Sequence, residues 1–117
     1  MDRKDIAQAL EAHGLRTIQF WIIDLFGRPR VTHVPASGLD RILDSGAPLD
    51  GSSVAGMSRV DRSDLAAMPD LDSFRIVPGT AGIPAAAILF CDVYRPDGTG
   101  QALDARAFMR RTLEKAR

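Results

Sequence analysis

The chain contains a single cysteine, Cys91, so no disulfide can form within it. Cys91 lies in the apolar run 85–91, and we therefore expect a buried, unreactive thiol. Only two histidines are present, His13 and His33, and neither has another histidine or a cysteine at the spacing of zinc ligands. We expect both to be structural or surface residues, and the chain alone to build no zinc site.

The chain also lacks a surplus of charge and a long hydrophobic run. Its 15 basic residues balance its 15 acidic residues, which argues against a nucleic-acid-binding surface. Arg110, Arg111, Lys115 and Arg117 cluster, and we interpret them as the solvated, dipole-favoured end of a helix. No run approaches the about 18 apolar residues of a membrane span, and the N-terminus has no signal-peptide core. These features predict a soluble, cytoplasmic protein.

Local patterns predict helices alternating with strands. We expect a helix over 2–13, strands over 17–23 and 30–34, a helix over 38–44, strands over 64–68, 74–77 and 85–94, and a last helix after residue 104. Asp2, Ser37 and Asp104 are the expected helix caps, because their side-chain oxygens can accept bonds from the first backbone N–H groups. Gly14 and Gly46 are expected to end the first two helices.

The order of these elements predicts the fold class. Strands 17–23 and 30–34 join through a tight turn and form a hairpin, and the most apolar strand, 85–94, is expected at the centre of the sheet. The result is an α+β fold, a β-grasp-like mixed sheet with helices packed on one face. The Pro/Gly-rich linker 96–100 is the candidate boundary between a domain at 1–101 and a helix at 102–117.

The segment 49–56 is the most informative part of the sequence. Asp50 precedes a glycine and two serines there, so we expect a loop that shapes a site and not a regular core element. Its carboxylate can hold a cation or accept a proton. The residues alone leave a second explanation open, in which Asp50 and the serines bond the loop's own backbone. Asp64, a polar residue that starts a strand, has the same two explanations.

Complete motifs for nucleotide binding or nucleophilic catalysis are missing. Neither G-x-G-x-x-G nor G-x-x-x-x-G-K-[ST] occurs, and no lysine follows Gly51 or Gly56. Ser52 and Ser53 have no histidine near them in sequence that could act as a base. The chain alone therefore provides no complete phosphate cradle and no catalytic serine pair.

Six short segments follow one another in an informative order. They are residues 20–27 (F-x-x-x-D-x-x-G), 33–36, 50–56 (D-G-S-S-V-x-G), 63–65, 68–70 and 91–98. Through these segments the chain resembles the N-terminal β-grasp domain of glutamine synthetase over nearly its full length. Each match is short, and the resemblance depends on all six in this order.

The resemblance implies a ligase that joins ammonia to glutamate in two steps. ATP phosphorylates the side-chain carboxylate of glutamate, and ammonia then displaces the phosphate. It implies that Asp50 is catalytic and lines the ammonium pocket of a neighbouring subunit, where a carboxylate can bind the cation and take its proton. Ser53 and Asp64 are implied to support this loop or contact substrate. The family's assembly is a homo-oligomeric ring that usually doubles to a dodecamer.

The resemblance also implies where the remaining machinery lies. ATP and the divalent metals, Mg²⁺ or Mn²⁺, are held by a C-terminal catalytic domain, of which residues 102–117 look like the first helix. We therefore expect this chain alone to bind no cofactor or metal and to have no ligase activity.

Two positions leave the amine substrate open. The bacterial family commonly has Phe at the position of Leu49 and an aromatic residue at that of Met57, and both flank the amine pocket. A glutamate ligase for a larger amine, such as a polyamine or ethanolamine, is therefore an alternative, although Asp50 favours ammonia. A free-standing β-grasp interaction module and a silent relative are further alternatives. A capped amphipathic helix at the C-terminus, in place of an exposed Gly-Gly tail, argues against the module.

Overall fold

The computed structural model describes residues 1–50, 64–100 and 104–117. The elements in chain order are α1 (Arg3–Ala12), β1 (Thr17–Ile23), β2 (Pro29–Pro35), the 3₁₀ turn η1 (Ala36–Gly38), α2 (Leu39–Ser45), β3 (Ala47–Asp50), β4 (Asp64–Pro69), the 3₁₀ turn η4 (Leu71–Ser73), β5 (Arg75–Val77), β6 (Ala86–Tyr94) and α3 (Ala105–Ala116). The five strands predicted from the sequence are confirmed to within one residue at each end.

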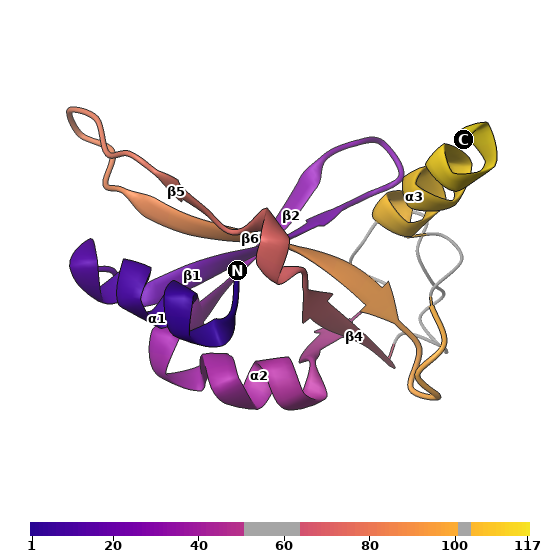
Figure 1. Ribbon diagram of the computed structural model, residues 1–117, viewed down its shortest axis with the longest axis horizontal. Helices are drawn as coiled ribbons and strands as arrows, with labels where there is room; N and C mark the ends of the chain where they lie inside the picture. The colour runs from indigo at the N-terminus through magenta and orange to yellow at the C-terminus, as the bar shows by residue number, and fades with distance from the viewer. Residues whose placement is uncertain (51–63, 101–103) are drawn as a thin grey trace.

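The strands form one mixed sheet in the order β2-β1-β6-β4-β3, with β5 pairing β6 beside this path. β1 and β6 run parallel, and the other neighbours run antiparallel. The predicted central position of the most apolar strand is confirmed, since β6 contacts β1, β4 and β5. In Figure 1, α1 and α2 lie together on one side of the sheet, and α3 lies apart from them beside the C-terminus.

Local sequence explains the first helix. The Asp2 side chain accepts from the Asp5 backbone N–H at 2.9 Å, and the Asp5 side chain accepts from the Asp2 N–H at 3.0 Å, so that each caps the other. Ile6 and Leu10, one turn apart, carry the buried face. The chain then turns at Gly14, where φ is 65°, a conformation that favours glycine.

The alternation of side chains divides the sheet into two faces. We call the buried side the core face; its residues on β1, β2, β4 and β6 pack against α1 and α2, and they are Ile18, Phe20, Ile22, Val34, Leu65, Ala67, Ala87, Leu89, Cys91 and Val93. We call the other side the open face; it carries half-buried residues such as Trp21, Phe90 and Asp92. The predicted α+β fold with helices on one face is therefore confirmed for α1 and α2.

Two local predictions are wrong. Ser37 does not cap α2, because the chain enters that helix through η1; Gly38 is the N-cap residue and makes no side-chain capping bond. Residues 49 and 50 do not belong to the predicted loop, because Ala47–Asp50 forms the strand β3. β3 forms because its backbone groups hydrogen-bond to those of β4, and this pairing does not depend on the side-chain pattern. Its Leu49 side chain packs against the core. Gly46 ends α2 as predicted, with φ 79°.

Candidate functional site

Asp50 and Asp64 meet at the end of the sheet. Asp50 is the last residue of β3, Asp64 is the first residue of β4, and the antiparallel register places them directly opposite each other. The neighbouring pair Leu49 and Leu65 faces the core, so alternation directs the two carboxylates to the open face, where both residues are exposed. Opposed carboxylates repel each other. The structure thus brings together two of the three predicted site residues, while Ser53 lies outside the described residues.

An aromatic pair lies on the open face across the neighbouring strands β1 and β6. The Trp21 and Phe90 rings contact edge to face, with centroids 5.9 Å apart. The Trp21 indole N–H donates to the Gln19 side chain at 3.0 Å, which fixes the ring. The open face therefore combines aromatic surface with carboxylates, unlike the apolar core face.

A charged cluster occupies the far end of β4, and sequence reasoning missed it. The Arg106 guanidinium donates to Asp70 at 2.7 Å and to Asp92 at 2.9 Å. Arg110 donates to both Asp92 oxygens at 3.2 Å. Arg110 is solvated as predicted, but it lies in the middle of α3 and pairs with Asp92 on the sheet, so its predicted place at the helix end is wrong. The hydrogen bond from Arg106 lowers the pKa of Asp70.

Asp104 is a capping residue, as predicted, and also a buried one. It is 1 % exposed; one carboxylate oxygen accepts from the Arg106 backbone N–H at 3.2 Å and the other from the Val93 N–H at 3.1 Å. Burial raises the pKa of Asp104 above its usual value, against the opposing effect of these two bonds. One side chain thus starts α3 and fastens it to β6.

Cys91 and the two histidines lie where the sequence predicts. Cys91 is fully buried, and desolvation raises the pKa of its thiol to about 12, so it is not a nucleophile. His13 and His33 are exposed, and the His13 ring bonds the Ala9 carbonyl oxygen at 2.8 Å. In the described ranges, no three His, Cys, Asp or Glu side chains come together as metal ligands. None of the described helices is long and apolar enough to cross a membrane.

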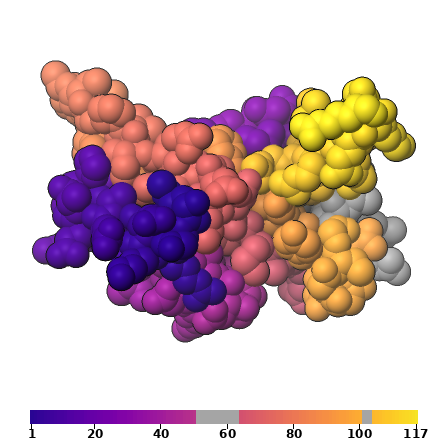
Figure 2. Space-filling view, in the orientation of Figure 1, coloured from indigo at the N-terminus to yellow at the C-terminus, as the bar shows by residue number. Residues whose placement is uncertain are grey.

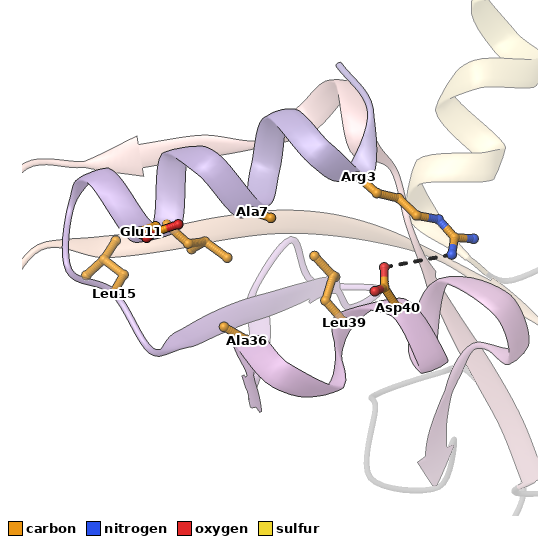
Figure 3. A pocket seen from close by; sticks show the side chains of 8 residues that line it. Arg3, Ala7, Glu11, Leu15, Ala36, Leu39 and Asp40 are labelled. Atoms are coloured by element: carbon orange, nitrogen blue, oxygen red, sulfur yellow. Dashed lines mark ion pairs between the residues drawn. The ribbon is translucent and has the colours of Figure 1, made fainter.

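A pocket of about 230 Å³ lies elsewhere on the molecule, between α1 and the start of α2 (Figure 3). Arg3 lies at one end, where it pairs with Asp44 at 2.7 Å and with Asp40 at 3.9 Å. The apolar lining comes from Ala7, Leu10, Leu15, Ala36 and Leu39. Because these residues belong to the helix layer, the pocket lies on the core-face side and does not include Asp50 or Asp64.

Comparison with known families identifies the domain. The family model described as glutamine synthetase, beta-Grasp domain, matches residues 14–96. The chain belongs to the glutamine synthetase β-grasp family. This match confirms the resemblance and the β-grasp fold that the sequence predicts, and it spans both strands that carry Asp50 and Asp64.

Curated relatives extend the match to almost the whole chain. A glutamine synthetase of Staphylococcus aureus (strain Mu50) is 38% identical over 113 residues, which is 97% of this chain and 25% of the relative. A glutamine synthetase of Staphylococcus epidermidis is 37% identical over the same share. The chain therefore spans about a quarter of the length of the relatives that it matches.

Solved structures share the fold. A GmaS/ADP complex has a TM-score of 0.81 at 24% identity, over 96% of this chain and 25% of that one. The Plasmodium falciparum glutamine synthetase has a TM-score of 0.80 at 17% identity, over 97% of this chain and 22% of that one. A glutamine synthase homologue has a TM-score of 0.70 at 28% identity, over 86% and 26% respectively. The β-grasp arrangement is thus shared across widely diverged sequences.

Proposed function

We propose that this chain is the N-terminal domain of a glutamine synthetase-type ligase that joins ammonia to glutamate at the expense of ATP. The observation that supports this most is the 38% identity over 97% of the chain to proteins named glutamine synthetase. The boundary at 101/102, with residues 102–117 as the first helix of a catalytic domain, is part of this proposal, as is a cytoplasmic location.

In this proposal Asp50 binds ammonium and accepts its proton. Ammonium has four donors and a positive charge, which suit a carboxylate, and the nucleophile must be neutral ammonia. Asp64 stands opposite Asp50, so both carboxylates would attract a cation bound at this end of the sheet. Ser53, in the segment that joins β3 to β4, is the third proposed site residue, as a loop support or substrate contact.

The domain would work as part of an assembly. We propose that it lends the Asp50 segment to the catalytic domain of a neighbouring subunit in a homo-oligomeric ring, which usually doubles to a dodecamer. Mg²⁺ and Mn²⁺ do not fit the described residues, which bring together no three His, Cys, Asp or Glu side chains; we propose that ATP and these metals bind in the catalytic domain. We therefore expect this chain alone to be inactive.

The nearest alternative differs only in the amine. The resemblance implies an aromatic residue beside the amine pocket at the position of Met57, which lies outside the described residues; Leu49 faces the core, away from Asp50, and therefore does not flank that pocket. A non-aromatic side chain at position 57 would leave room for a larger amine, so a polyamine or ethanolamine ligase is the second candidate. A free-standing interaction module is the third.

An assay of the full-length protein separates these candidates. The protein is supplied with glutamate, ATP and Mg²⁺, and with ammonium, putrescine or ethanolamine in turn, and phosphate release and the amide product are measured. We expect turnover with ammonium at a higher kcat/KM than with either larger amine. Preference for a larger amine would support the second candidate, and no turnover with any amine would reject the ligase. The 117-residue chain, assayed in parallel, should give no product.

A further inference from the structure

No residue of α3 is buried, although the helix lies against the open face. Its large apolar side chains point away from the described residues, with Phe108 61%, Met109 57% and Leu113 53% exposed. Figure 2 shows α3 projecting from the body of the molecule. Apolar burial usually holds a helix on a sheet. Among the described residues, polar contacts must hold this one.

Arg106 makes the central contacts. Its guanidinium reaches two carboxylates with separate nitrogens, Asp70 at 2.7 Å and Asp92 at 2.9 Å, and it lies over the Phe90 ring at 5.9 Å. These three charged side chains are partly buried: Arg106 is 25% exposed, Asp70 29% and Asp92 14%. Partly buried, forked pairs of this kind constrain geometry more than exposed pairs do.

The contacts around Arg106 strengthen the attachment. Arg110, one turn later, donates to Asp92 at 3.2 Å, so the first two turns of α3 share one carboxylate. Asp104 joins the start of the helix to the Val93 backbone. All of these contacts go to β6 or to the residue after β4.

These contacts lead to the candidate site through β4, which carries Asp64 and pairs with both β6 and β3. Asp70 directly follows β4, and Asp92 on β6 pairs with Met68 on β4. β4 begins at Asp64, opposite Asp50. A helix held at one end of β4 therefore has a fixed place relative to the carboxylates at the other end.

We propose that Arg106 is a positioning residue: by bridging Asp70 and Asp92, it joins α3, β4 and β6 into one rigid body. In the ligase this body fixes α3, and the chain that follows it, relative to Asp50 and Asp64. The rigid body can be tested on this chain alone, while its effect on catalysis rests on the proposed function.

Amide hydrogen exchange of the ¹⁵N-labelled chain tests the rigid body. We expect Arg106→Ala to speed the exchange of α3 amides and of the Val93 amide about tenfold or more, and to leave the pairing of β1 and β6 unchanged. Exchange in Arg106→Lys should be intermediate, because an ammonium keeps the charge but lacks the two separate nitrogens with which the guanidinium reaches Asp92 and Asp70. Lys115→Ala is the matched control, since no ion pair of Lys115 is found within the described ranges. Unchanged α3 exchange, or equal acceleration throughout the core, would overturn the proposal.

Kinetics of the full-length protein test the positioning role. We expect Arg106→Ala to lower kcat/KM for the amine about tenfold, mainly through KM, and Arg106→Lys to restore part of it. Normal kinetics of Arg106→Ala beside accelerated α3 exchange would keep the rigid body and reject its role in catalysis. A wild-type protein without ligase activity would reject the proposed function, and the exchange experiment would still decide the role of Arg106 in holding α3.

Discussion

The two faces of the sheet differ in what they can carry. The core face is apolar from β2 to β4 and is covered by α1 and α2. The open face keeps Asp50 and Asp64 exposed and pairs Asp92 with arginines of α3. An ionised side chain on the core face would lose its hydration, at a cost of several kcal/mol unless paired. A strand that alternates with period two can therefore stabilise the fold with one face and bind ligands with the other.

The largest expected difference between the faces is in stability. Leu89 is 0 % exposed on the core face, and its neighbour Ile88 is half-buried on the open face. We expect Leu89→Ala to lower the free energy of unfolding by about 2–5 kcal/mol, because it removes contacts and leaves a cavity. Ile88→Ala, of nearly equal volume change, should cost about 1 kcal/mol. Urea unfolding measures both, and equal losses would contradict the division into two faces.

Asp24 shows when the core face can hold a carboxylate: its oxygens must accept hydrogen bonds from the protein in place of water. It continues the core-face alternation of β1, is 1 % exposed, and accepts from the backbone N–H groups of Phe26 at 2.9 Å and Arg28 at 2.8 Å. We expect Asp24→Ala to cost about 2 kcal/mol, because buried donors lose their acceptor.

The matched turn residue is Asp97, which is exposed and accepts from the Thr99 N–H at 2.9 Å. Asp97→Ala should cost less than Asp24→Ala, because water can replace the lost acceptor. Thermal unfolding of the two variants makes the comparison. A larger loss at Asp97 than at Asp24 would show that burial does not set the value of these bonds.

A smaller effect is expected from acid at the open face. The Arg106 bond holds the pKa of Asp70 below its ordinary value of 3.8, so the ionised form is favoured by folding. The stabilisation is complete above pH 3.8 and is lost as pH falls below 3.8 through the folded pKa. Asp104 acts in the opposite sense: its pKa is raised by burial, so its contribution falls as pH rises from 3.8 through the folded pKa.

Asp70→Asn isolates the first of these two effects. We expect this variant to be less stable by about 1 kcal/mol at pH 7 and to approach the wild type as pH falls below 3.8. Tm measured from pH 2 to pH 7 gives both curves. Parallel curves over the whole range would mean that the pair with Arg106 contributes no pH-dependent stability.

Sequence patterns predict the features of the fold that depend on residues close together in the chain. The hairpin, the central strand and the burial of Cys91 follow from alternation and apolar runs, and Asp2 and Asp104 follow from local capping chemistry. β3 was missed, because its strand conformation depends on pairing with a segment far along the chain.

The site divides in the same way. Asp50 could be singled out because a carboxylate beside glycine and serine is locally distinctive. The contact of Arg106 with Asp70 joins residues 36 apart, and no local pattern marks it. The sequence shows only that Arg106 stands two residues after the predicted cap Asp104. Without the topology of the sheet, nothing in the sequence indicates which carboxylates Arg106 contacts. The pairing of Asp64 with Asp50 likewise required the register of β3 and β4.

The most direct test of the central claim is the amine dependence of Asp50→Asn in the full-length protein. Asparagine keeps the shape of the side chain and removes its charge and its ability to take a proton. We predict a loss of about 10²-fold or more in kcat/KM for ammonium, with Tm unchanged, and no loss for Asp40→Asn, an exposed carboxylate on α2. Wild-type kcat/KM for ammonium in Asp50→Asn would contradict the account.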